Sequence, residues 1–508
     1  MIHKKIDSKV IEQNIKVSLR NEKSEWEKST LGDACYKSGG SIQTGPFGSQ
    51  LHKSDYVPFG IPSIMPVNIG DNRIVIDGIA RISVEDAKRL SRYLVRKGDI
   101  VYSRRGDVER RAIIRDNEDG WLCGTGCLRV RFGNGIVDPL FASYQLGTSE
   151  ARGWIVRHAI GATMPNLNTE ILSALPFVIP PIEVQKRIAD ILSSLDDKIE
   201  VNRKINQTLE AMAQAMFKSW FVDFEPVMAK IEAKAAGHDP ELAAMSAISG
   251  KTAAELATTP KSQYDELAHT ASLFPDDFED SELGEIPKGW KVINFGSMIE
   301  SNIGGDWGND TPTDSYTEKV KILRGTDLPD VFSGVDSRVP VRFVEKRKFE
   351  KRKLCDGDIV IEISGGSKDQ PTGRSLYITQ KIINRLDENV EPASFCRRFR
   401  PVNNEIGLIL AIHLLKIYTE GKTWLYQNQS TGISNFQTNT FLEREPVVLP
   451  GTAIVNSFYH KVRPLFDLIH SSENIRLSEL RDTLLPKLLS GELETTMRMN
   501  KDHQTGVL

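Results

Sequence analysis

The feature that most constrains this chain is an internal repetition. Four short segments of the 508-residue sequence recur in the same order about 260 to 270 residues later. Self-similarity in order predicts two copies of one structural plan rather than a chance recurrence of common dipeptides. The matched pairs are Trp26–Gly32 with Trp290–Gly296, Lys97–Val101 with Asp356–Val360, Met164–Thr169 with Ile433–Thr438, and Leu175–Pro180 with Glu445–Pro450.

Each copy begins as a strand-rich unit and ends in a long helical pattern. Short apolar runs alternate with Gly, Pro, Asn and Asp clusters, and the helical periods within the units are short, which predicts the α+β class. The length therefore divides into two mixed α/β units, two helices and a linker. The predicted boundaries are 1–181 for an N-terminal tail and first unit, 182–225 for the first helix, 226–285 for the linker, 286–450 for the second unit, 451–495 for the second helix and 496–508 for a tail.

The first helix carries a heptad pattern that starts just after Pro180 and Pro181, a suitable helix start. Apolar residues recur at alternating spacings of four and three, with two asparagines completing the seam, as in a coiled coil. A buried asparagine costs stability but fixes register and partner. The seam positions are Ile188, Leu192, Leu195, Ile199, Asn202, Asn206, Leu209, Ala213, Met216 and Trp220.

The second helical stretch, Val462–Leu489, has apolar residues at Leu465, Ile469, Ile475, Leu480, Leu484 and Leu488. The two helices are predicted to pair with each other and to hold the units apart. The alternative is that each helix packs only on its own unit. Between the copies, the stretch from Asp276 to Glu285 holds six carboxylates and no base, which predicts a solvated connection after an Ala-rich segment with short helices.

Composition excludes several classes of protein. With 65 Lys+Arg against 68 Asp+Glu, the chain cannot be a uniformly basic nucleic-acid coat. The sequence contains no run of about 18 apolar residues that would predict a membrane span. A cytoplasmic location is therefore expected. Gly250-Lys251-Thr252 lacks the first glycine of a phosphate loop, and Cys123 and Cys127 lack the second pair of a zinc site. The sequence therefore predicts no catalytic residues and no metal site.

Basic residues gather beside the repeated Gly-Asp-Ile-Val strand in each copy. The local net charge is +4 from Arg96 to Arg115 and +5 from Arg342 to Lys353, which predicts two equivalent polyanion contacts. Lys and Arg bind phosphates without regard to sequence, whereas Arg, Asn and Gln can also read base edges. The candidate DNA-binding residues are Arg104, Arg105, Arg110, Arg111, Arg342, Lys346, Arg347, Lys348, Lys351, Arg352, Arg374, Asn428 and Gln429.

These segments together resemble the DNA specificity subunit of type I restriction-modification systems. The resemblance covers nearly the whole chain, and it rests on the paired Trp-x4-Leu/Phe-Gly openings, the Gly-Asp-Ile strands and three further runs. These runs are Asn166–Leu192, the junction Phe274–Trp290, and Leu484–Glu492, which closes the second helix. The resemblance implies two target recognition domains joined by antiparallel spacer helices, with each domain reading half of a bipartite site in double-stranded DNA.

The same resemblance implies the partners. The spacer helices would dock two adenine methyltransferase subunits and, through them, restriction/translocase subunits. S-adenosylmethionine, ATP and Mg²⁺ are expected on those partners and not on this chain. The docking positions predicted from the helices are Ile188, Leu192, Leu195, Ile199, Asn202, Leu209, Met216, Leu465, Ile469, Leu480 and Leu484. The alternatives are a non-enzymatic scaffold that binds protein or glycan partners and, less favoured, a self-contained nuclease or methyltransferase.

Overall fold

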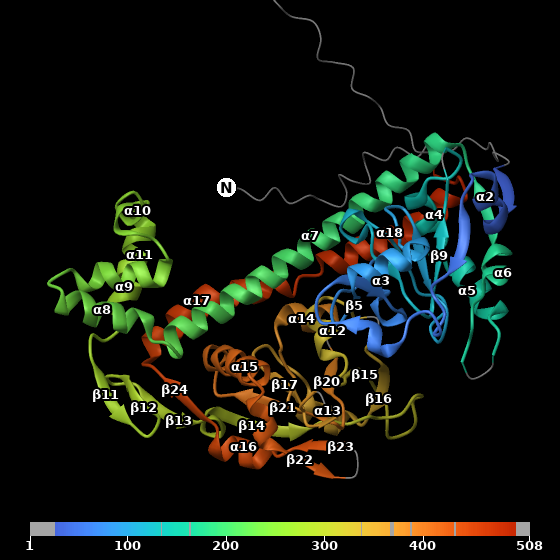
Figure 1. The fold of residues 1–508 in the computed structure, drawn as a ribbon. Coiled ribbons are helices and arrows are strands. Elements are labelled where there is room, and N and C mark those ends of the chain that lie inside the picture. Colours follow the sequence, from blue (N-terminus) through green and yellow to red (C-terminus); the bar gives the residue numbers. More distant parts are fainter. Residues whose placement is uncertain are drawn as a thin grey trace, which may run out of the picture. The chain divides into compact units, whose positions relative to one another are not determined.

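The computed structural model describes residues 26–133, 135–161, 164–336, 338–365, 370–386, 389–430 and 433–493 (Figure 1). It forms two compact units. One contains the described residues up to Lys198 together with those from Leu477 onward, and the other is Ile199–Arg476. Both mix helices and sheets, which confirms the predicted α+β class.

The first repeated unit, which we call the first recognition domain after the role predicted for it, is built on two four-stranded sheets with the orders β2-β9-β6-β7 and β3-β5-β4-β8. A separate antiparallel pair, β1 (Glu27–Thr30) with β10 (Pro176–Ile179), brings the two ends of the domain together. The sheet strands are β2 (Ser41–Thr44), β3 (Tyr56–Val57), β4 (Ile61–Ile64), β5 (Ala80–Ile82), β6 (Ile100–Ser103), β7 (Arg111–Ile113), β8 (Leu122–Cys123) and β9 (Cys127–Arg131). The helices are α2 (Leu31–Lys37), α3 (Val84–Arg89), α4 (Pro139–Gln145), α5 (Ser149–His158) and α6 (Thr169–Ser173).

The second recognition domain repeats this topology. The order β14-β21-β17-β19 matches β2-β9-β6-β7, the order β16-β15-β20 matches β5-β4-β8, and β13 pairs with β24 as β1 pairs with β10. A third small sheet, β18-β23-β22, stands where the first domain has only the isolated bridges of Asn166 with Arg105 and Ile160. The strands are β13 (Lys291–Asn294), β14 (Ile299–Gly304), β15 (Glu318–Leu323), β16 (Val341–Val344), β17 (Ile359–Glu362), β18 (Ser364–Gly365), β19 (Ser375–Tyr377), β20 (Val390–Pro392), β21 (Cys396–Pro401), β22 (Gln427–Ser430), β23 (Ile433–Phe436) and β24 (Pro446–Leu449). The helices are α12 (Leu328–Phe332), α13 (Lys346–Arg352), α14 (Gln380–Arg385), α15 (Asn404–Thr419) and α16 (Thr438–Arg444).

The repeated Gly-Asp pair has the same structural role in both domains. Gly98 and Gly357 adopt φ values of 87° and 90°, which other residues rarely accept. The buried aspartate that follows each glycine binds an arginine on the strand that pairs with the Gly-Asp-Ile strand. Asp99 pairs with Arg131 at 2.6 Å, and Asp358 pairs with Arg400 at 2.8 Å. The predicted duplication is therefore confirmed at the level of individual ion pairs.

The spacer begins with α7, a continuous helix from Ile182 to Phe221, shown in green in Figure 1. The predicted seam is confirmed, because Ile188, Leu192, Ile199 and Asn202 are buried. Within each compact unit the second helical segment of the spacer runs antiparallel to α7. Asn202 donates to Asn474 at 2.9 Å and Asn206 to the carbonyl oxygen of Ile469 at 3.2 Å, and Asp196 accepts from Arg481 at 2.8 Å.

The second spacer helix is not continuous, contrary to the sequence prediction. It consists of α17 (Thr452–Ile469) and α18 (Glu473–Leu489), with a break at residues 470–472. The break begins at His470, whose buried ring contacts the second recognition domain through a 3.0 Å bond to Thr379. Asn206 satisfies the carbonyl that the break exposes at Ile469. The seam asparagine therefore stabilises an interruption as well as fixing register.

Both helices also pack on their own domains, so the two alternatives for the spacer are not exclusive. Ile188 and Leu192 belong to the core of the first domain, and Ala213, Phe217 and Trp220 to that of the second. Leu465, Leu480 and Leu484 are half-buried, while Ile469 is buried.

The segment between the copies folds into a small helical module and a hairpin. The helices α8 (Glu225–Ala235), α9 (Pro240–Ser249), α10 (Ala253–Ala257) and α11 (Lys261–Ser272) enclose a core that includes Met245 and Leu256. The acidic stretch is not an open connection. It forms β11 (Phe278–Ser281) and β12 (Gly284–Pro287), and Lys234 and Lys288 pair with Asp276 and Asp277 beside them. Among the described residues, no helix is long and apolar enough to cross a membrane.

Candidate nucleic-acid interface

In the first recognition domain, the turn after β6 meets the repeated Asn-Leu-Asn-Thr segment. Leu167 donates its backbone N–H to the carbonyl oxygen of Arg104 at 2.8 Å, and Arg105 lies opposite Asn166 in an antiparallel bridge. The second domain has the same register. Phe436 donates to the carbonyl oxygen of Ile363 at 2.8 Å, and Ser364 lies opposite Asn435.

Two more loops join this place in each domain. In the first domain, Gly45 donates to the carbonyl oxygen of Cys127 at 2.9 Å and Arg104 to that of Gly126 at 2.8 Å. In the second domain, Gly305 donates to Cys396 at 3.1 Å and Ile363 to Phe395 at 2.9 Å. We call residues 45–48, 103–106, 124–127 and 164–167 the first loop cluster. Residues 305–308, 363–365, 393–396 and 434–436 form the second loop cluster.

The predicted basic residues of the first domain have different environments. Arg105 is exposed and has no ion-pair partner among the described residues. Arg104 is half-buried, and its buried Nε has no hydrogen-bond partner there. Arg110 pairs with Asp107 at 2.6 Å on the surface. Arg111 lies in the core, where burial lowers its pKa and its Nε donates to the carbonyl oxygen of Ser143 at 2.7 Å. Arg111 is therefore structural and leaves the set of candidate DNA contacts.

In the second domain, the basic residues lie mainly on α13. Lys346, Arg347 and Lys351 are exposed and have no ion-pair partner within the described part of the chain, whereas Lys348 pairs with Glu345. Three of the seven charges in the basic segment are thus free on one short helix. This helix stands before β17, whereas the basic turn of the first domain follows β6.

The prediction of two equivalent polyanion contacts is therefore wrong in its topology. The helix of the first domain that corresponds to α13 is α3, which follows β5 as α13 follows β16 and carries Glu85 and Asp86 in its first turn. The repeat preserves the backbone but not the position of the surface charge, because exposed residues outside the core are free to differ.

Arg342 and Arg352 hold a loop and are not free cations. Arg352 donates to the carbonyl oxygen of Gly304 at 3.1 Å and pairs with Asp306 at 2.7 Å. Arg342 pairs with Asp310 and stacks on the ring of Trp307 at 4.6 Å. Both arginines therefore fix residues 304–310 against β16 and α13.

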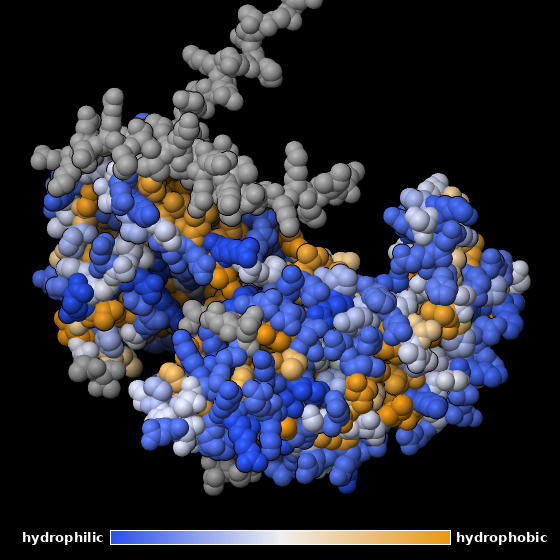
Figure 2. Space-filling view, turned by 180° about the vertical axis from the view of Figure 1, so that it is seen from behind, coloured by the Kyte–Doolittle hydropathy of each residue, from blue (hydrophilic) through white to orange (hydrophobic). Residues whose placement is uncertain are grey.

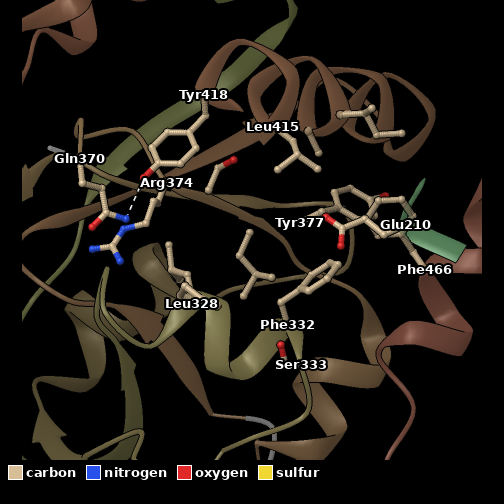
Figure 3. A pocket seen from close by; sticks show the side chains of 15 residues that line it. Glu210, Leu328, Phe332, Ser333, Gln370, Arg374, Tyr377, Leu415, Tyr418 and Phe466 are labelled. Atoms are coloured by element: carbon tan, nitrogen blue, oxygen red, sulfur yellow. Dashed lines mark hydrogen bonds between the residues drawn. The ribbon is translucent and has the colours of Figure 1, made fainter. Parts of the chain in front are cut away.

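Arg374 lies at one end of a cavity of about 330 Å³ whose walls are mainly apolar (Figure 3). Its guanidinium is held by both oxygens of Glu362, at 2.9 and 2.6 Å, so its charge is already paired. At the other end lies Glu210, whose pKa is raised by burial. Asn428 is exposed on β22 and accepts from Gln437. The backbone of Gln429 lies in the same strand, but its side chain is outside the described part of the structure.

The predicted docking residues of the spacer face inward. Ile188, Leu192, Ile199, Asn202 and Ile469 are buried within the chain, and the other positions are at least half-buried, so the seam is already occupied. The apolar residues that α7 leaves exposed are Val201, Ile205 and Met212. These residues lie between the seam positions, where the heptad pattern alone gave no reason to select them.

Sequence reasoning also missed an exposed aromatic residue in each loop cluster. Phe47 lies between Gly45 and Gly48, and Trp307 lies between Gly305 and Gly308. The signal was present as Gly-x-aromatic-Gly in both copies, but only the hydrogen bonds of Gly45 and Gly305 show that the two loops correspond.

Comparisons with known proteins agree with this architecture. A family model described as type I restriction modification DNA specificity domain matches residues 23–211. The HindI specificity subunit of Haemophilus influenzae is 31% identical over 459 residues, covering 85% of this chain and 95% of that protein. The chain belongs to the family of type I restriction enzyme specificity subunits. As a member, it is a non-catalytic protein that recognises DNA sequence.

A more distant relative also matches along most of both chains. The MjaIX specificity subunit of Methanocaldococcus jannaschii is 23% identical and covers 92% of this chain and 94% of its own length. A crystal structure of the type I restriction-modification S subunit of M. genitalium matches with a TM-score of 0.47 at 16% identity, covering 93% and 98% of the two chains.

Proposed function

We propose that this specificity subunit reads a bipartite sequence in double-stranded DNA, with one half-site for each recognition domain. The observation that carries the proposal is the equal register of the two loop clusters. Each pairs the turn after the Gly-Asp-Ile strand with the repeated Asn segment, and each presents one exposed polar residue from this pairing. Arg105 in one cluster and Asn435 in the other have side chains able to bind base edges.

Phosphate binding would come from different elements in the two domains. Lys346, Arg347 and Lys351 on α13 are free to neutralise phosphates at the second half-site, and Arg105 is an exposed cation within the first cluster. Such contacts position the duplex without reading its sequence.

The spacer would dock two adenine methyltransferase subunits, which would bring S-adenosylmethionine, and through them restriction/translocase subunits, which would bring ATP and Mg²⁺. The exposed residues Val201, Ile205 and Met212 on α7 are better placed for this contact than the occupied seam. Apolar side chains at helical spacing on a surface are typical of helix docking.

The test is a genome-wide map of adenine methylation in cells that contain the methyltransferase subunit of the same system, with and without this chain. We expect a two-part motif that appears only when the chain is present. Exchanging residues 26–181 for those of another family member should change one half of the motif and leave the other unchanged. Absence of any chain-dependent motif, or loss of both halves on exchange with the complex intact, would contradict the proposal.

A further inference from the structure

The loop that carries an exposed aromatic residue is built in the same way in both recognition domains. A Cβ atom on Gly45 would lie 2.1 Å from the carbonyl oxygen of Gly124, and one on Gly305 would lie 2.0 Å from that of Pro392. Both positions therefore require glycine, because the backbone of the loop lies directly against the strand connection. Two residues later each loop presents an aromatic side chain, Phe47 or Trp307.

These aromatic side chains are held at the surface and not in the core. Phe47 is 53% exposed and Trp307 is 38% exposed, although burial of a benzyl or indole group would stabilise the fold. Most of the surface drawn in Figure 2 is hydrophilic, and hydrophobic residues form separate patches on it. An isolated exposed aromatic residue is ordinary, but its recurrence at the same backbone position of two diverged copies is not.

An arginine from the following helix anchors each loop. In the first domain, Arg89 of α3 donates to the carbonyl oxygen of Gln50 at 2.8 Å, and Gln50 closes the turn by donating to Phe47 at 2.8 Å. In the second domain, Arg352 of α13 holds Gly304 and Asp306, and Arg342 covers a face of the Trp307 ring. The loops are therefore rigid supports, which lowers the entropy cost of contact with a ligand.

The charge around the loops identifies the ligand as a polyanion. In the second domain, the helix that anchors the Trp307 loop also presents the free cations Lys346, Arg347 and Lys351. In the first, the strand connection that holds Gly45 also holds Arg104, next to exposed Arg105. A flat apolar ring can stack on a nucleic-acid base while the unpaired cations beside it bind the phosphate backbone. This combination fits a nucleic acid better than it fits an apolar protein surface.

We infer that Phe47 and Trp307 are base-stacking residues, each inserting at one step of its half-site in double-stranded DNA. This inference rests on the proposed function, because it needs each domain to bind one half-site. The inference goes beyond the proposed function by assigning a second mode of recognition. In this mode the ease of unstacking one base step contributes to sequence preference.

The test uses the full complex with the methyltransferase subunit and 40-base-pair duplexes that carry the mapped motif, with 2-aminopurine placed at each position in turn. Its fluorescence rises when it loses its stacking neighbours. We expect a rise at one position in each half-site. F47A should abolish the rise in the first half-site only, and W307A in the second only, each with about a 10- to 100-fold loss of affinity.

Matched controls separate stacking from other causes. F59A and W424A remove aromatic residues that are also exposed but lie outside both clusters, and should leave affinity unchanged. F47W and W307F keep an aromatic ring and should retain the fluorescence rise. The slope of log affinity against log salt should be the same in F47A and in the unsubstituted chain, because no phosphate contact is lost.

Several outcomes would overturn the inference. Loss of methyltransferase assembly in F47A or W307A, with the chain still folded, would place the aromatic residues in a protein interface. Unchanged affinity in both variants would leave the rings without a role in DNA binding. A failure of the unsubstituted complex to bind any mapped motif would instead contradict the proposed function, and is therefore distinguishable.

Discussion

The two recognition domains share a backbone but differ in where they place charge. The Asp99–Arg131 and Asp358–Arg400 pairs are identical in role, as are the hydrogen bonds of Gly45 and Gly305. Two buried leucines of the first domain, however, correspond to glutamates in the second. Leu175 and Glu445 accept the same backbone hydrogen bond, from Leu31 and Phe295, and Leu122 and Glu391 hold the same place in the parallel pairs β4–β8 and β15–β20.

The pKa values of the two buried glutamates are shifted in opposite directions. Burial raises the pKa of Glu445, but hydrogen bonds from His413, Lys422 and Tyr426 outweigh this and lower the pKa to about 2. Burial raises the pKa of Glu391 to about 7, and neither of its carboxyl oxygens has a hydrogen-bond partner among the described residues. A buried carboxyl group is therefore tolerated in this duplicated fold where neighbouring residues supply hydrogen-bond donors. Where they supply none, its burial costs free energy.

The largest expected effect tests what the domains share. D99N and D358N should each lower the free energy of unfolding of their own domain by about 3 kcal/mol, because the arginine loses its buried carboxylate partner. Urea titration with hydrogen exchange read at β6 and β17 measures both. R110A, which removes only a surface pair, should change stability by less than about 0.5 kcal/mol. Clearly unequal losses for D99N and D358N would show that the repeated pair has different roles.

The next effect tests Glu445, the buried glutamate whose carboxylate has hydrogen-bond donors. E445Q should lower the stability of the second domain by about 2 kcal/mol at pH 7, since Lys422 and His413 lose a charged acceptor. Because the folded pKa lies below the ordinary 4.5, the stabilisation is full above pH 4.5 and is lost as pH falls towards about 2. Urea midpoints between pH 3 and 7 measure this loss, which E445Q should not show. An E445Q chain that keeps the same pH dependence would assign it to another group.

A smaller effect of opposite sign tests the unsatisfied glutamate. E391L, which installs the residue of the first domain, should raise stability by about 1–2 kcal/mol at pH 8. Since the folded pKa of about 7 exceeds 4.5, the native chain should lose stability as pH rises from 4.5 through 7. The gain from E391L should therefore be small at pH 5 and full at pH 8. The matched exchange L122E should destabilise the first domain. A gain from E391L that is equal at both pH values would argue that packing, not charge, is responsible.

The smallest effect concerns the surface. The double variant K346A/R347A should weaken binding of the assembled complex to all duplexes by about 1 kcal/mol and reduce the salt slope by about 2. K88A on the corresponding helix α3 should have little effect, because Glu85 and Asp86 already neutralise that helix. Binding measured between 50 and 200 mM salt gives both quantities. A change in the preferred sequence would mean that α13 reads bases.

Much of the fold could be predicted from the sequence because the signals are periodic or repeated. The heptad of α7 placed Ile188, Leu192, Ile199 and Asn202 in the seam, and four ordered matches gave the two domains. The break at His470 could not be predicted in this way, because the partner of its buried ring is Thr379, 91 residues away. The small sheet β18-β23-β22 also depends on pairing between distant segments.

The candidate site was less predictable than the fold. Charge density selected Arg111, Arg342 and Arg352, and the ability of arginine to read base edges selected Arg374. The structure commits all four to carbonyl groups, carboxylates or an aromatic ring. Charge density overlooked Phe47 and Trp307, which carry no charge. The sequence by itself determined the duplication, the class of the fold and the spacer seam, because each is written in local spacing. Only the tertiary structure decided which cations remain free and which loops meet, because ion-pair partners and backbone hydrogen bonds come from residues far apart in the chain.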